Sequence, residues 1–239
     1  MIKYLNLPLT FDADKMAAEV LDLEATNWKA HYNTAHYTGD WSIIPLHAPG
    51  GDIHNIISTP AGTTGAIPFA DTVFLQRCPY ISVVLNQLQC EKRSVRLMYL
   101  APGAIIKAHS DQQLSVEDGE VRLHLPVMTN DEMFFYLEEE RIKMDAGSCW
   151  FLNLSLTHRL ENKGATARIH LVVDCVVNEW LLAEFNTPGI IKKEIDAPQP
   201  SFKHSKEEIL LIIEELKRQD NEAARNLIVQ MEAKLNDHA

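Results

Sequence analysis

The stretch "KAHSDQQ" at residues 107–113 holds two side chains, His109 and Asp111, whose types and spacing suit a metal ion. Side chains two positions apart on a β-strand point to the same face, so this imidazole and this carboxylate can reach one ion together. A third ligand has to come from a distant segment, and the candidate is His158 in "LSLTHRLEN". Two histidines and one carboxylate on one face of a metal leave open positions, as in non-haem Fe(II) sites. The alternative is that His109 and Asp111 form the polar end of a buried strand.

An arginine ten positions after His158, Arg168 in "TARIHLVVD", could bind an anion near such a metal. A dicarboxylate that chelates the metal through one end needs a fixed cation at its other end. The planar, two-pronged guanidinium of arginine suits that role. The alternative is a solvated charge on the open face of a sheet.

Polar and aliphatic residues alternate in two predicted strands, which indicates one polar and one apolar face for each strand. In "VRLHLPV", Arg122 and His124 share one face, and the intervening aliphatic residues share the other. In "ARIHLVVD", Arg168 and His170 likewise lie on the face opposite Ile169. A third strand, "VRLMYL", places Arg96 on one face with Met98 and Leu100. The simplest packing places the aliphatic faces against covering helices and the charged faces in a pocket.

Short predicted strands follow one another from Ser94 to Val177, with turn sequences at 130–131, 145–147 and 162–164. This pattern favours an antiparallel sandwich or jelly roll over an alternating α/β fold. We therefore expect a mainly β protein with flanking helices (α+β), built on a double-stranded β-helix core of the jelly-roll or cupin type. The predicted strands are "WSIIPLH", "SVRLMYLA", "EVRLHLPV", "MFFYLE", "RIKM", "SCWFLNL" and "ARIHLVVDCVV".

Helical patterns flank the predicted jelly roll. Residues 11–24 have the spacing of an amphipathic helix. Near the other end, Ser205 begins one predicted helix with a capping box, and a second helix follows Asp220. We expect a jelly-roll domain with N-terminal helices at 1–178 and a C-terminal helical extension at 179–239. The extension would be a small hairpin that packs on the jelly roll or forms a homodimer.

Composition argues against nucleic-acid and membrane partners. The 239-residue chain has a formal net charge of −11, whereas nucleic-acid binding requires a clustered basic face. No stretch approaches the roughly 20 apolar residues of a membrane span, and the N-terminus lacks the features of a signal peptide. The four cysteines are widely spaced without a CxxC pair, so we expect reduced thiols and a cytoplasmic protein.

The ordered set of "HSD", "RLHLPV", "GSCWFLNLSLTH" and "RIHLVVD" resembles the aspartyl/asparaginyl β-hydroxylase family of Fe(II)/2-oxoglutarate-dependent dioxygenases. That family includes protein aspartyl/asparaginyl hydroxylases and bacterial enzymes that act on free proline. The resemblance covers roughly Arg96 to Asp174, and it implies Fe(II), 2-oxoglutarate as co-substrate, and O2. The site residues it implies are His109, Asp111 and His158 for Fe(II), Arg168 and His124 for 2-oxoglutarate, and Arg122 and Arg96 for the substrate.

The resemblance implies an enzyme that hydroxylates an unactivated C–H bond of an amino acid or amino-acid derivative and releases succinate and CO2. A small substrate suits a cavity with several cations, because an α-carboxylate needs such partners. One alternative is a hydroxylase of peptidyl Asp or Asn, which would need an open groove. Others are a non-catalytic cupin-like protein that binds a metal or a small acid, and a jelly-roll isomerase with a Lewis-acid metal.

Overall fold

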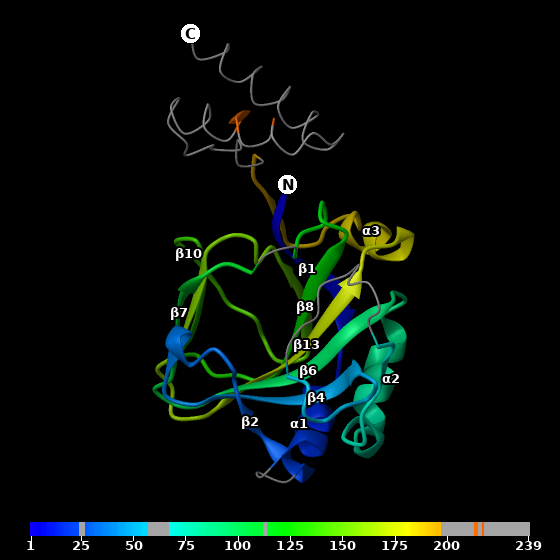
Figure 1. Ribbon diagram of the computed structural model, residues 1–239, viewed down its shortest axis with the longest axis vertical. Helices are drawn as coiled ribbons and strands as arrows, with labels where there is room; N and C mark the ends of the chain where they lie inside the picture. Colours follow the sequence, from blue (N-terminus) through cyan, green and yellow to red (C-terminus); the bar gives the residue numbers. More distant parts are fainter. Residues whose placement is uncertain (24–26, 57–66, 112–113, 197–212, 215–216, 218–239) are drawn as a thin grey trace. The chain divides into compact units, whose positions relative to one another are not determined.

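The computed structural model describes residues 1–23, 27–56, 67–111, 114–196, 213–214 and 217. Two compact units divide the chain, Met1–Ile195 and Asp196–Ala239. The first unit contains two β-sheets and every predicted site residue (Figure 1). The predicted C-terminal hairpin lies largely outside the described residues, which in this region are Ile213, Glu214 and Lys217, all helical.

The larger sheet has nine strands among the described residues, and every pairing in it is antiparallel. The strands are β1 Ile2–Thr10, β2 Lys29–Ala30, β4 Trp41–Pro49, β5 Phe69–Asp71, β6 Lys92–Leu100, β8 Glu120–Met128, β11 Ser148–Leu152, β13 Arg168–Val176 and β14 Lys192–Glu194. Their order is β14-β1-β11-β8-β13-β6-β4-β2, and β5 pairs with β4. Strand β13 is therefore central, hydrogen-bonded to β8 on one side and to β6 on the other.

The smaller sheet has five strands in the described part of the chain, again with antiparallel pairing. They are β3 Tyr37–Thr38, β7 Ile105–His109, β9 Met133–Leu137, β10 Glu140–Ile142 and β12 His158–Asn162. Their order is β10-β9-β12-β7-β3. Strands β7 and β12 are neighbours although they lie far apart in the sequence, and this pairing brings the two candidate metal segments together.

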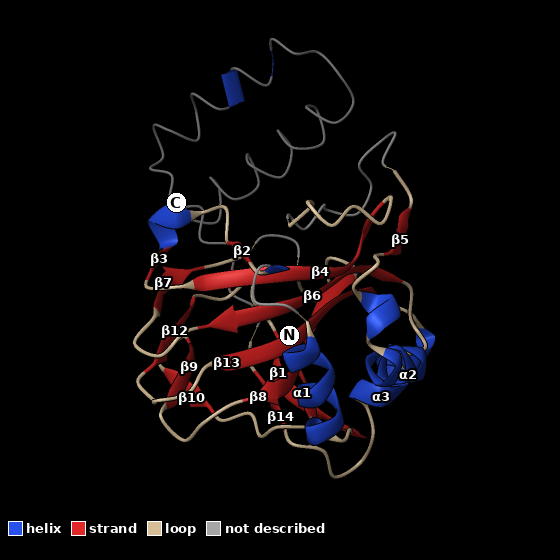
Figure 2. Cartoon of the chain, turned by 90° about the horizontal axis from the view of Figure 1, so that it is seen from below, coloured by secondary structure: helices blue, strands red, loops and turns tan. Residues whose placement is uncertain are grey.

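Helices cover the outer face of the larger sheet. They are α1 Ala13–Asp22, α2 Pro79–Gln87 and α3 Glu179–Phe185, with short 3-10 helices at Thr34–His36 and Leu75–Arg77. Figure 2 shows these α-helices on one side of the molecule and β9, β10 and β12 on the other. Asp12 begins α1 by accepting a hydrogen bond from the Lys15 backbone N–H at 3.0 Å. Met16 and Val20 then point into the core beneath the sheet.

The alternation predicted for the central strands is confirmed. Leu123 and Leu125 are fully buried in the cluster that the helices cover, whereas Arg122 and His124 line a cavity between the two sheets. Burying a leucine side chain completely stabilises a fold by about 1.5–3 kcal/mol. The burial therefore fixes which face of the strand meets the cavity. The mainly β jelly roll with flanking helices that the sequence predicts is confirmed.

Gly147 makes the turn into β11 possible. Its φ is +81°, a left-handed conformation that favours glycine. A side chain at this position would also collide with the Phe11 backbone carbonyl. The Phe11 N–H in turn donates to the Gly147 carbonyl at 2.8 Å, so the turn joins the end of β1 to the start of β11.

The first unit extends beyond residue 178, where the sequence suggested a domain boundary. Strand β14 pairs with β1, and Leu181 and Phe185 of α3 are buried in the core cluster. Strand β1 and helix α2 were not predicted from the sequence, although the "LNLPLT" part of β1 alternates leucine with other residues. No helix in the described ranges is long and apolar enough to cross a membrane.

Candidate active site

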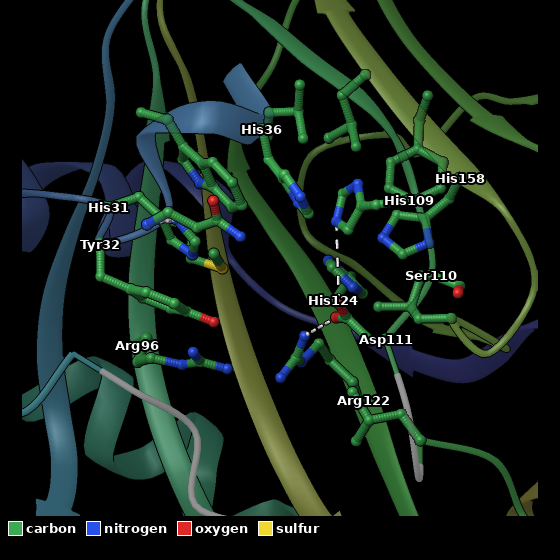
Figure 3. A pocket seen from close by; sticks show the side chains of 18 of the residues that line it. His31, Tyr32, His36, Arg96, His109, Ser110, Asp111, Arg122, His124 and His158 are labelled. Atoms are coloured by element: carbon green, nitrogen blue, oxygen red, sulfur yellow. Dashed lines mark hydrogen bonds and ion pairs between the residues drawn. The ribbon is translucent and has the colours of Figure 1, made fainter.

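The three candidate metal ligands lie together at one end of the smaller sheet (Figure 3). His109 ends β7 and His158 begins β12, and the two residues are register partners across these strands. The backbone N–H of Asp111 donates to the Leu154 carbonyl at 2.8 Å, which holds the chain in place after β7. One ligand atom from each of the three residues lies within 4.8 Å of the others. This arrangement can bind a single metal ion.

Both histidines present the same ring nitrogen to the cavity. His109 Nδ1 lies 2.7 Å from the Lys107 carbonyl, and His158 Nδ1 lies 3.1 Å from the Leu156 carbonyl. A carbonyl oxygen only accepts hydrogen bonds, so each Nδ1 carries a proton and Nε2 is the nitrogen left for a metal. Burial, reinforced by the neighbouring His109, lowers the pKa of His158 to about 4. The His158 ring is therefore neutral at physiological pH, as a metal ligand must be.

Asp111 is held as an ionised carboxylate. Its Oδ2 accepts a hydrogen bond from the Arg122 guanidinium at 2.6 Å, and its Oδ1 lies 3.8 Å from His109 Nε2. Burial raises the pKa of Asp111, but Arg122, His158 and His109 together outweigh burial and hold the pKa below its ordinary value. An ionised oxygen therefore lies next to the free nitrogens of the two histidines.

All of the predicted site residues line one cavity of about 330 Å³, a size typical of small-molecule sites. The metal candidates come from the smaller sheet, whereas the cationic side chains come from β6, β8 and β13 of the larger sheet. The predicted residues that line this cavity are Arg96, His109, Asp111, Arg122, His124, His158 and Arg168.

Arg168 is a buried cation without a carboxylate partner among the described residues. Its exposed fraction is 2%, its nearest polar contact is His170 Nδ1 at 2.7 Å, and its Nε has no hydrogen-bond partner. Burial lowers the pKa of Arg168 to about 9, so the guanidinium stays protonated at neutral pH. Burying an unpaired charge is costly, which makes this position suited to an anionic ligand.

His124 lies in the same wall with both ring nitrogens unpaired in the described part of the structure. Burial, with Arg168 and Arg122 nearby, lowers the pKa of His124 well below its ordinary value. The ring is therefore neutral, with one nitrogen able to donate and the other to accept. Its edge contacts the Phe135 ring, with centroids 6.1 Å apart.

A second charged cluster underlies the cavity. Asp174, fully buried on β13, accepts hydrogen bonds from Arg122 Nε at 2.6 Å and Arg96 at 2.9 Å. Burial alone would lower the pKa of Arg122, but Asp174 and Asp111 raise it above its ordinary value. Asp174 was not predicted as a site residue. Its position on the polar face of "RIHLVVD", in line with Arg168, was the available signal.

An aromatic wall at the cavity mouth was also missed. His31 stacks on Trp41 with ring centroids 3.6 Å apart and planes at 6°, and Tyr37 packs edge-on against Trp41. Burial, with Arg96 nearby, lowers the pKa of His31 to about 4. Tyr32 beside it is 58% exposed and points toward Arg96 (Figure 3). The concentration of aromatic residues and histidines in "HYNTAHYTGDW" was the signal for this wall.

Comparisons with known proteins identify relatives of this chain. The L-proline cis-4-hydroxylase of Rhizobium meliloti (strain 1021) is 26% identical over 167 residues, which is 69% of this chain and 57% of that enzyme. The chain therefore spans less than two thirds of the length of this relative.

One solved structure similar to this chain is an oxidoreductase of the 2OG-Fe(II) oxygenase family from Burkholderia pseudomallei. Its TM-score is 0.48, and the sequences are 13% identical over 74% of this chain and 88% of that one. A prolyl-4-hydroxylase from Pseudomonas putida has TM-score 0.46 and 11% identity over 74% of this chain and 95% of that one. The family model described as Aspartyl/Asparaginyl beta-hydroxylase matches residues 11–177, well over half of the chain. The chain therefore belongs to the aspartyl/asparaginyl β-hydroxylase family.

Proposed function

We propose that this protein is an Fe(II)- and 2-oxoglutarate-dependent dioxygenase that hydroxylates a C–H bond of an amino acid or amino-acid derivative and releases succinate and CO2. One observation carries the proposal. A three-residue ligand set whose atoms lie within 4.8 Å shares a cavity with Arg168, a buried cation that lacks a carboxylate partner in the described chain. A metal site and a fixed cation in one cavity suit a chelating dicarboxylate.

The donor set fits Fe(II). His109 and His158 offer their Nε2 atoms, and Asp111 offers one ionised oxygen. Two imidazoles and one carboxylate with open positions are the ligands of non-haem Fe(II) oxygenases. When bound, Fe(II) with 2-oxoglutarate and O2 supplies the oxidising power for C–H hydroxylation. The chain itself contributes orientation and a cavity that limits access of water.

Arg168 would hold the far carboxylate of 2-oxoglutarate. The guanidinium can pair with both carboxylate oxygens in one plane, which fixes the orientation of the co-substrate as well as its affinity. His124 lines the same cavity, and its neutral ring offers one donor and one acceptor. Pairing with the co-substrate would also neutralise the buried charge of Arg168.

The substrate is proposed to be a free amino acid, with L-proline as the first candidate. The relative named for L-proline hydroxylation supports this choice, as does the Arg96 guanidinium beside the aromatic wall of His31 and Trp41. A carboxylate can pair with Arg96, while an apolar ring can pack on Trp41. A cavity of about 330 Å³ favours a small substrate over a peptide.

Substrate-stimulated succinate release and O2 consumption test the function. The assay would compare L-proline, the other free amino acids, and peptides that contain Asp or Asn, each with Fe(II) and 2-oxoglutarate. We expect release with a free amino acid and none in Asp111→Ala. Release with peptides alone would favour the peptidyl hydroxylase. Metal and 2-oxoglutarate binding without succinate from any substrate would favour a non-catalytic binding protein.

We also infer a cytoplasmic protein that forms a homodimer through its C-terminal helices. Four buried, unpaired cysteines support a reducing compartment. The dimer rests on the amphipathic pattern of the sequence after Ser205. Light scattering on the full chain tests it, because a monomer would contradict the inference.

A further inference from the structure

We propose that Arg122 is a positioning residue that holds the metal carboxylate Asp111, and that Asp174 holds Arg122 in turn. This positioning role differs from the substrate-binding role implied by the family resemblance. This inference rests on the proposed function, because it assigns a role around the proposed metal site.

Every nitrogen of the Arg122 guanidinium is already paired with a carboxylate. Nε donates to Asp174 Oδ1 at 2.6 Å, and NH2 donates to Asp174 Oδ2 at 3.0 Å. NH1 donates to Asp111 Oδ2 at 2.6 Å. Figure 3 shows Arg122 reaching Asp111 from below the cavity. These three bonds use three of the five guanidinium N–H donors, so Arg122 is held between two carboxylates before any ligand binds.

The register of β8 against β13 fixes the contact between Arg122 and Asp174. Asp174 on β13 is the direct register partner of Arg122 on β8, so both side chains point to the same face of the sheet. Asp174 is fully buried, and it accepts from Arg122 through two parallel bonds. Such a two-pronged pair has a defined direction as well as strength, which aims NH1 of Arg122 toward Asp111.

The contact with Arg122 makes the two carboxylate oxygens of Asp111 different. Oδ2 is occupied by Arg122 NH1, whereas Oδ1 lies on the His109 side at 3.8 Å from Nε2. The carboxylate therefore offers one oxygen to a metal, and rotation about its last bond would break a charge-assisted hydrogen bond. Groups that orient metal ligands in this way typically change metal affinity by about 10–100-fold when they are removed.

Arg96 differs from Arg122 although both contact Asp174. Arg96 uses one terminal nitrogen for Asp174 at 2.9 Å, and its Nε has no partner among the described residues. It lines the cavity and forms no hydrogen bond or ion pair with Asp111 among the described residues. Arg96 therefore has more donors free for a substrate anion than Arg122 has, and it is a matched control for Arg122.

Mn(II) titration of the purified full chain, followed by electron paramagnetic resonance, tests the proposal. Arg122→Gln should bind Mn(II) about 10–100-fold more weakly than the wild type, whereas Arg96→Gln should stay within about threefold. Each variant loses one positive charge near the metal, and that loss alone would tighten cation binding in both. Weaker binding confined to Arg122→Gln therefore identifies positioning. Unchanged binding in Arg122→Gln, or equal weakening in both, would overturn the proposal.

Two further measurements test the proposal even if Arg122→Gln fails to fold. Arg122→Lys keeps the charge, but one ammonium cannot make the paired bonds, so Mn(II) binding should again weaken while circular dichroism stays unchanged. A crystal structure of the Mn(II)-loaded wild type should show Asp111 bound through one oxygen, with Arg122 on the other. A bidentate Asp111, or Arg122 turned away from it, would overturn the proposal.

The Mn(II) experiment separates this inference from the proposed function, because it needs neither substrate nor turnover. Succinate release by the wild type together with unaffected Mn(II) binding in Arg122→Gln would refute only the positioning role. Selective weakening in Arg122→Gln without succinate release from any tested substrate would support the positioning role and refute the dioxygenase. A wild type that binds no Mn(II) would refute both.

Discussion

Replacing Arg168 with methionine is expected to have two effects of opposite sign. It should weaken 2-oxoglutarate binding and stabilise the ligand-free protein. The guanidinium is 2% exposed, its Nε is unpaired, and its closest polar contact is the neutral His170 at 2.7 Å. Methionine is of similar length, adapts to irregular spaces, and carries no charge to desolvate.

The size of each effect follows from the cost of buried charge. Leaving one member of a buried charge pair alone costs about 3–5 kcal/mol. At about 1.4 kcal/mol per tenfold change, 2-oxoglutarate affinity should fall by roughly two to three and a half orders of magnitude. In the ligand-free protein, replacing a buried charge by an apolar group of similar volume stabilises by up to about 4 kcal/mol.

Calorimetric titration of the Mn(II)-loaded protein measures the affinity, and thermal unfolding with and without 2-oxoglutarate measures both effects. The wild type should gain stability with the ligand, because the ligand binds only the folded state. Arg168→Met should start at a higher midpoint and gain little. Arg168→Lys is the matched control, and it should recover part of the affinity because it keeps the charge without the planar fork.

Two results would refute this reasoning. A folded Arg168→Met protein that binds 2-oxoglutarate like the wild type would show that the co-substrate carboxylate lies elsewhere. A ligand-free variant several kcal/mol less stable than the wild type would show that Arg168 is a structural cation. The second result would contradict the inference that its partner is a ligand.

Three other predictions concern separate parts of the molecule. Asp111→Ala should abolish both Mn(II) binding and succinate release; a variant that keeps either contradicts its role as a ligand. Burial lowers the pKa of His31 from 6.5 to about 4, so the unfolded chain binds the proton more readily. The free energy of unfolding should therefore fall as the pH decreases from 6.5 to about 4. Urea denaturation can measure this, and the free energy should depend less on pH in His31→Phe. Gly147→Ala should destabilise the fold by more than Gly103→Ala, because both have positive φ but only Gly147 faces a backbone carbonyl; equal midpoints in thermal unfolding would contradict this.

Alternation within single strands was predictable from the sequence. Arg122 and His124 could be assigned to the cavity because leucine and valine at the odd positions of "VRLHLPV" must face a core. The same rule placed Arg168. Its physical basis is local, since adjacent side chains of an extended strand point in opposite directions.

Contacts between strands were not predictable in the same way. The pairing of Arg122 with Asp174 depends on the register of β8 against β13, and a slip of one residue would send the carboxylate to the opposite face. The stacking of His31 on Trp41 likewise joins a loop to the start of β4. Strand β1 alternates leucine with other residues in "LNLPLT", but its place between β11 and β14 depends on strand pairing that no local pattern reveals.

The placement of the metal candidates on one sheet and the guanidiniums on the other has an evolutionary consequence. Substitutions of Arg96 on β6 change the wall of the cavity without altering β7 or β12, which carry the histidine ligands. Duplicated genes of this kind can therefore diverge in the molecule they recognise while the reaction centre is inherited intact. Selection on a new nutrient or metabolite would act first on this part of the larger sheet.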